Sequence, residues 1–89
     1  MWELRYADEA TDQLLRLDRA IARRVSNYLV DTVATGDPRS RGRGLTGPLA
    51  GYWRYRVGDY RVIAQIEDAR LVVLAVTEGH RSEVYREAS

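Results

Sequence analysis

The segment Gly51-Tyr52-Trp53-Arg54-Tyr55-Arg56-Val57-Gly58-Asp59-Tyr60-Arg61 decides how the rest of the chain folds. Two runs of alternating residues flank Gly58-Asp59, and this dipeptide predicts a two-residue hairpin turn because glycine supplies the positive φ that such turns need. A turn of two residues also fixes the register of the two strands. The cross-strand partners expected from it are Val57 with Tyr60, Arg56 with Arg61, Tyr55 with Val62, and Arg54 with Ile63.

This register sorts the side chains of the hairpin by face. Successive side chains of a strand point to opposite faces, so the apolar and aromatic side chains share one face and Arg54, Arg56 and Arg61 share the other. Like charges directly opposite each other destabilise a sheet by roughly 0.2–1 kcal/mol per pair. The pattern favours a polyanion, such as a nucleic-acid backbone, as the ligand of this face. The alternative is a polar face on which the arginines spread apart into water.

Length and composition limit the class of protein. The 89 residues predict a single domain spanning residues 1–89. No apolar run reaches the roughly 18 residues of a membrane span, and the N-terminus lacks the basic and apolar regions of a signal peptide. Cysteine is absent, which excludes disulfides and thiolate metal sites and is typical of a cytoplasmic protein. We therefore expect a cytoplasmic protein that does not interact with membranes.

Positive charge is concentrated in the middle of the chain. Residues 39–61 hold six arginines and one aspartate, a net charge of +5, whereas residues 1–38 and 62–89 each carry −2. Such a block indicates a polyanion site better than the overall net charge of +1 does. Every basic residue is arginine, which does not act as a proton-transfer base near neutral pH.

The residues before this block predict a strand and two helices. Residues 1–6 alternate as a half-buried strand does, and residues 7–17 change to a helical period, with Asp8 as the expected N-cap. Asp18 is expected to cap a second amphipathic helix of roughly four turns, which ends before Pro38. Two helices with so short a connection are expected to pack as an antiparallel pair on one face of a sheet.

Residues 37–49 form a glycine-rich loop in which Arg39, Arg41 and Arg43 alternate with other residues. A flexible basic loop of this kind follows a nucleic-acid backbone through charge alone, so these three arginines are candidate RNA-binding residues. The alternative is a solvated connection. The glycine spacing does not match a phosphate-binding P-loop.

The strands after the hairpin complete an antiparallel meander. Tyr60–Ile66 continues as a strand, and Leu71–Thr77 is nearly all apolar, which predicts a strand buried on both faces. The expected fold is α+β, with a small antiparallel sheet of about four strands and two N-terminal helices packed on one face. The other face carries the arginines, above a floor formed by Leu74 and Val76.

The available side chains favour phosphate chemistry without a metal or cofactor. One histidine, no cysteine and scattered acids do not form a metal-ligand cluster. Arginines neutralise a phosphate while a ribose 2′-hydroxyl attacks it, His80 moves a proton near neutral pH, and Tyr85 hydrogen-bonds or stacks on a base. The alternatives are that His80 is a surface turn residue and Tyr85 a core residue.

Several segments together resemble a known family. They are Leu15–Asp18, Asp37–Arg39, Gly44–Leu49, Trp53–Ile63, Gly79–Arg81 and Val84-Tyr85. With them the chain resembles the RelE branch of the RelE/ParE superfamily, the toxins of type II toxin–antitoxin pairs. The resemblance implies a metal-independent endoribonuclease, an mRNA interferase that enters the ribosomal A site and cuts the codon there. It also implies a cognate RelB-like antitoxin, through which alone the pair contacts operator DNA.

The same resemblance implies roles for individual residues. Arg54 and Arg56 match two basic positions that are usually lysine in RelE-like enzymes, and Arg61 matches the arginine that stabilises the scissile phosphate. Arg81 matches a second catalytic arginine, and Tyr85 matches the C-terminal tyrosine of the site. Arginine in place of lysine puts a proton-transfer role at positions 54 and 56 in doubt, and His80 is a candidate replacement.

Two other functions stay open at this point. One is a ParE-like toxin that inhibits DNA gyrase by binding it and has no nuclease activity. The other is a catalytically decayed toxin that only binds its antitoxin.

Overall fold

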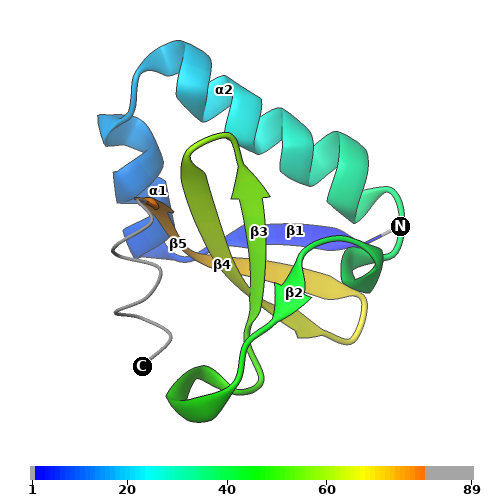
Figure 1. The fold of residues 1–89 in the computed structure, drawn as a ribbon. Coiled ribbons are helices and arrows are strands. Elements are labelled where there is room, and N and C mark those ends of the chain that lie inside the picture. The colour runs from blue at the N-terminus through cyan, green and yellow to red at the C-terminus, as the bar shows by residue number, and fades with distance from the viewer. Residues whose placement is uncertain (1, 80–89) are drawn as a thin grey trace.

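The computed structural model describes residues 2–79. The elements in chain order, seen in Figure 1, are β1 (Glu3–Tyr6), α1 (Asp8–Arg16), α2 (Arg19–Tyr28), β2 (Arg43–Gly44), β3 (Trp53–Val57), β4 (Tyr60–Glu67) and β5 (Arg70–Glu78). A π-helical turn, Leu29–Ala34, follows α2, and 3-10 turns occupy Pro38–Ser40 and Gly47–Leu49. The fold is α+β with two N-terminal helices, as the sequence predicts.

The strands form one sheet in the order β1-β5-β4-β3-β2. The β3–β4–β5 meander is antiparallel as predicted, and the short β2 adds an antiparallel fifth strand at one edge. At the other edge β1 runs parallel to β5. The alternation of apolar and polar residues sets which face a strand buries and not the direction of the strand, so it could not reveal this parallel pairing.

Both helices begin close to the predicted residues, but the second ends earlier than predicted: α2 stops at Tyr28 and the chain continues as the π-helical turn Leu29–Ala34. The Asp18 side chain caps α2 as expected, because its Oδ2 accepts a hydrogen bond from the Ala20 backbone N–H at 3.0 Å. The prediction for α1 was wrong: Ala7 occupies the N-cap position and makes no side-chain hydrogen bond, and Asp8 is the first helical residue. An acidic residue there still interacts favourably with the positive end of the helix dipole.

One face of the sheet is covered by the helices. α1 packs on β5 and α2 on β3, and Figure 1 shows α2 crossing the sheet near the β3–β4 turn. The buried hydrophobic residues of the core are Ala10, Val25, Leu29, Tyr55, Val57, Val62, Ala64, Leu71, Val73 and Val76. β5 is fully buried only on this side, since Val72 and Ala75 on the other side are half-buried.

A β-bulge corrects the predicted floor of the arginine face. The register between β4 and β5 shifts between Ile63 and Ala64, so that Ile63 faces Ala75 but Ala64 faces Val73. The extra residue in β5 is Leu74, and beyond it the alternation of side chains is reversed. Val76 therefore lies in the core and not under the arginines. Ala75 and Thr77 take the uncovered face instead.

The bulge is tied to the helices by a side chain. Gln13 Oε1 of α1 accepts a hydrogen bond at 2.6 Å from the backbone N–H of Val76. A bulge leaves a backbone group without its ladder partner, and a partly buried donor of this kind costs about 1–3 kcal/mol if it is left unsatisfied. Gln13 thus holds β5 in the register that turns Thr77 toward the uncovered face.

Candidate nucleic-acid interface

The β3–β4 hairpin has the predicted register at every position. Val57 faces Tyr60, Arg56 faces Arg61, and Arg54 faces Ile63. Gly58 has a φ of 62°, the left-handed conformation that the two-residue turn needs. Arg54, Arg56 and Arg61 consequently share the face that the helices leave uncovered.

A fourth arginine joins this face from the preceding loop. β2 pairs with β3 so that Arg43 lies directly opposite Arg54. We call Arg43, Arg54, Arg56 and Arg61 the arginine face. It contains two cross-strand pairs of like charge, Arg43 with Arg54 and Arg56 with Arg61. Like charges directly opposite each other are unfavourable in a sheet, and an anion bound over either pair would offset this.

Charges at the opposite end of the same sheet face are neutralised. Glu3 forms ion pairs with Arg5 and with Arg70, and Arg70 also lies 3.5 Å from a Glu67 carboxylate oxygen. The hydrogen bond from Arg5 and its charge lower the pKa of Glu3. Within residues 2–79, Arg43 and Arg56 form no such ion pair. Arg43 and Arg56 therefore carry positive charge that no carboxylate of the described residues pairs with.

Two aromatic side chains of β3 hold the basic loop in place. Trp53 Nε1 donates a hydrogen bond to the Arg41 carbonyl oxygen at 2.6 Å, and the Tyr55 hydroxyl donates one to the Pro38 carbonyl oxygen at 2.7 Å. The predicted RNA-binding residues Arg39 and Arg41 thus lie in a loop fixed at two points, and both side chains are exposed. The loop is anchored to the strand that carries Arg54 and Arg56.

Gly42 permits this close approach of loop and strand. Its φ is 72°, and a Cβ atom there would overlap the Arg54 carbonyl oxygen and would come within 2.7 Å of the Tyr55 ring and 2.9 Å of Trp53 Nε1. A side chain at this position would push β2 off β3. Gly42 is a residue of the site that the sequence pattern did not single out.

Arg61 is the buried member of the arginine face. Only 3% of its surface is exposed, whereas Arg43 and Arg56 are exposed. It lies opposite Thr77, and Gly79 packs against its side chain. The predicted site residues His80, Arg81 and Tyr85 lie outside the described residues.

A pocket opens beside the arginine face at the edge of the sheet. It has a volume of about 450 Å³ and is lined by Tyr28, Gly42, Arg43, Arg54 and Arg56. We call it the edge pocket. Tyr28 comes from α2, and the amphipathic pattern of that helix gave no reason to assign it to the site. Only the packing of α2 against β3 brings it to the arginines, so no local sequence signal could have found it.

Residues 2–79 contain no group of three or more His, Cys, Asp or Glu side chains positioned to share a metal ion. In the same part of the chain, no helix is long and apolar enough to cross a membrane.

The buried Tyr55 hydroxyl makes stability sensitive to alkaline pH. Burial, together with the neighbouring Tyr28, raises the pKa of Tyr55 above its ordinary value near 10. Above that pH the unfolded chain loses this proton while the folded chain keeps it, so the free energy of unfolding falls as pH rises. Tyr55→Phe should flatten this slope in denaturant titrations, but lower stability near neutral pH by about 1–3 kcal/mol because the Pro38 carbonyl loses its donor.

The control for this prediction is Tyr52→Phe, which leaves the Tyr55 hydrogen bond in place. Tyr6 also has a pKa raised by burial, so part of the alkaline slope should persist in Tyr55→Phe. An unchanged slope in that variant would show that Tyr55 is not the group responsible.

Nearly the whole chain matches a known protein family. The family model described as "ParE toxin of type II toxin-antitoxin system, parDE" matches residues 4–85, nearly the whole sequence. The chain belongs to this ParE toxin family. It is therefore a type II toxin–antitoxin toxin of the RelE/ParE superfamily, as the sequence resemblance predicts. A comparison with curated protein sequences gave no significant match.

Solved structures agree with this membership of the ParE toxin family. The RelBE2 toxin–antitoxin complex from Mycobacterium tuberculosis contains a chain that is 26% identical, with a TM-score of 0.81 over 86% of this chain and 96% of that one. The isolated RelE toxin of E. coli is 21% identical, with a TM-score of 0.73 over 99% and 95% of the two chains. The YoeB/ParE toxin from Agrobacterium tumefaciens, 21% identical, has a TM-score of 0.70 over 88% and 99%. The last two are similar in fold alone.

Proposed function

We propose that this toxin is a ribosome-dependent mRNA endonuclease that cuts codons in the ribosomal A site. The observation that carries the proposal is the arginine face. Two cross-strand arginine pairs lie on the uncovered face of the sheet, at its β2–β4 end. Beside them is a loop that carries further arginines and whose backbone is hydrogen-bonded to β3 at two points. A scissile phosphate is the ligand that would offset the repulsion within these pairs, because arginine binds phosphate oxygens in a bidentate manner.

The proposed reaction is a transesterification within the RNA. The 2′-oxygen forms a bond to the adjacent phosphorus while the bond from phosphorus to the 5′-oxygen breaks, which leaves a 2′,3′-cyclic phosphate and a 5′-hydroxyl. One proton leaves the 2′-hydroxyl and another reaches the departing 5′-oxygen. The charge that develops on the phosphoryl oxygens is where fixed guanidinium groups stabilise the transition state most.

The residues divide this work in the following way. Arg54 and Arg56 bind the phosphate, the buried Arg61 opposite Arg56 adds its positive charge to neutralise it, and Arg81 assists the leaving group. His80 or Tyr85 moves the proton, because arginine stays protonated near neutral pH. Arg39, Arg41 and Arg43 bind the RNA backbone on either side of the cut.

The proposed function implies binding partners and a cellular location for the toxin. Its partners are mRNA, the ribosomal A site and a RelB-like antitoxin that covers the arginine face, with operator DNA reached only through that antitoxin. The M. tuberculosis relative, the most similar of the three structures described, was crystallised as a toxin–antitoxin complex. The site of action is the cytoplasm, where ribosomes and mRNA meet.

The second candidate function is inhibition of DNA gyrase by protein binding. It is favoured by the matching family model, which carries the ParE name. A gyrase inhibitor has no need of paired arginines around a phosphate, and this is why we place it second. A third candidate is a decayed toxin that retains only antitoxin binding.

One experiment separates these functions. Purified toxin is added to ribosomes carrying a defined mRNA and, separately, to gyrase in a supercoiling assay. We expect cuts within the A-site codon, seen by primer extension, 5′-hydroxyl ends on the products, no cutting of mRNA without ribosomes, and normal supercoiling. Intact mRNA with blocked supercoiling would identify a gyrase inhibitor, and inactivity in both assays with retained antitoxin binding would identify a decayed toxin.

A further inference from the structure

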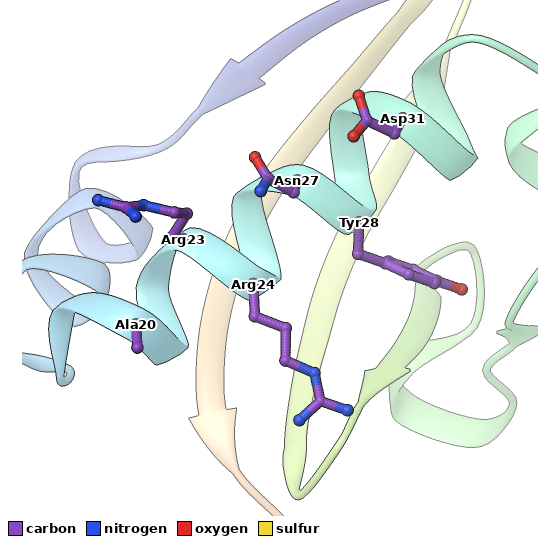
Figure 2. A pocket seen from close by; sticks show the side chains of 6 residues that line it. All are labelled: Ala20, Arg23, Arg24, Asn27, Tyr28 and Asp31. Atoms are coloured by element: carbon purple, nitrogen blue, oxygen red, sulfur yellow. The ribbon is translucent and has the colours of Figure 1, made fainter.

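Tyr28 forms the common wall of two pockets that both contain arginines. One is the edge pocket. The other, about 510 Å³ in volume, lies along α2 and is lined by Ala20, Arg23, Arg24, Asn27, Tyr28 and Asp31. We call it the helix pocket. Figure 2 shows the Tyr28 ring projecting sideways from α2 with its hydroxyl outermost.

The position of the Tyr28 ring is fixed by its neighbours. Its centroid lies 6.4 Å from that of Tyr55 at an interplanar angle of 63°, an edge-to-face contact. Tyr55 is fully buried and is itself held by Pro38. Tyr28 is only half-buried, so part of its ring is available to a ligand while the rest is held by the core.

The short length of β2 explains how a helix residue reaches the arginine face. β2 pairs only with Trp53 and Arg54. Beyond these two residues β3 is the edge of the sheet within the described part of the chain. Side chains from the covered and the uncovered face can meet around such an edge, and this is why Tyr28 from α2 lines the same pocket as Arg54 and Arg56.

The charges of the two pockets differ. The edge pocket contains three arginines and no acid, whereas the helix pocket contains two arginines and Asp31. A phosphate is therefore favoured in the edge pocket. An uncharged planar group is favoured on the Tyr28 ring, because aromatic side chains flanked by basic ones bind single-stranded RNA by stacking on its bases.

We propose that Tyr28 is a base-contacting residue, on which the base next to the scissile phosphate stacks while Arg54 and Arg56 bind that phosphate and Arg43 binds the adjacent RNA backbone. This inference rests on the proposed function, because it deepens the RNA site described there. It adds a residue of α2 to a site otherwise built from strands and the basic loop. It also predicts that the identity of this base influences cleavage, because purines stack more extensively than pyrimidines.

The test uses short RNA oligonucleotides of equal length with 2′-O-methyl riboses, which cannot be cut, each with one abasic position. Binding to the full-length toxin is measured by fluorescence anisotropy at low salt. For the wild type, one abasic position should weaken binding by about 5- to 150-fold, the range that corresponds to base–aromatic stacking. In Tyr28→Leu the penalty at that position should fall below about twofold while the other positions are unchanged.

Two control variants distinguish stacking from a structural role. Tyr28→Phe keeps the ring and should keep the penalty. Tyr60→Leu removes another half-buried tyrosine that packs against the core but lines neither pocket, and it should also keep the penalty. Thermal melting and antitoxin binding show whether each variant is folded.

The inference is overturned if folded Tyr28→Leu retains the wild-type penalty at every position, or if the folded wild type binds none of the oligonucleotides. Ribosome cleavage is measured in parallel. A wild type that shows the Tyr28-dependent penalty but cuts no mRNA would retain the inference and refute the proposed nuclease, so the two failures are distinguishable.

Discussion

Replacing Arg43 and Arg56 together by glutamine is expected to make the toxin more stable and far less active. Each of these arginines faces another arginine across the sheet, so the double variant removes one charge from both like-charged pairs. Stability should rise by roughly 0.2–1 kcal/mol per pair. Cleavage of ribosome-bound mRNA should fall by at least about 100-fold, the typical effect of removing a group that stabilises transition-state charge. Glutamine keeps much of the length of the side chain, so the packing of its stem is largely preserved.

A matched control exists on the same face of the sheet. Arg5→Gln/Arg70→Gln makes the same change in net charge, but at the end where these arginines interact with Glu3 and Glu67. It should leave cleavage unchanged and lower stability slightly, because exposed ion pairs contribute about 0–1 kcal/mol. Added salt should stabilise the wild type more than Arg43→Gln/Arg56→Gln, since screening weakens repulsion between exposed charges. Equal losses of cleavage in the two double variants would mean that overall charge, and not the arginine face, drives activity.

Gly42→Ala is expected to abolish activity by displacing the basic loop. The new methyl group would overlap the Arg54 carbonyl oxygen and press against the Tyr55 and Trp53 side chains. The left-handed backbone conformation adds about 1–2 kcal/mol of strain for a residue with a Cβ. Loss of the hydrogen bonds from Trp53 and Tyr55 to the loop adds about 0.5–1.5 kcal/mol each. We expect a total loss of roughly 2–5 kcal/mol in denaturant titrations, and no cleavage even by the fraction that stays folded.

Gly47→Ala introduces the same backbone strain without a steric clash. Gly47 has a φ of 66°, close to that of Gly42, but nothing lies within 4 Å of the place its Cβ would occupy. This variant should lose only the strain energy of about 1–2 kcal/mol and keep its cleavage activity. If the two alanine variants behave alike, the close approach of loop and strand at Gly42 has no special importance.

The features that sequence could predict are those that depend on neighbouring residues. Gly58-Asp59 determines a local turn, and the turn determines which arginines face each other. The Asp18 cap was predictable for the same reason. Asp8 was placed wrongly because adjacent positions at a helix start differ only in backbone geometry.

The features that sequence could not predict depend on contacts between distant segments. The bulge at Leu74 reverses the alternation of β5, and nothing in the apolar run of residues 71–77 marks the position of the extra residue. The pairing of Arg43 with Arg54 depends on how the basic loop folds back onto β3. Tyr28 reaches the edge pocket only through the packing of α2. His80, Arg81 and Tyr85 stay predictions, since they lie outside the described residues.

The limited length of β2 has a further consequence for the free toxin. Where β2 ends, β3 presents backbone groups that a strand from another molecule could pair with, a common route to aggregation. Arg56 lies on this unpaired edge of β3, and its positive charge repels the same edge of a second copy. The charge of this guanidinium group would therefore also oppose edge-to-edge pairing of two copies of the toxin. The variant Arg43→Gln/Arg56→Gln should therefore aggregate more readily than the wild type at high concentration, even if its melting temperature is higher.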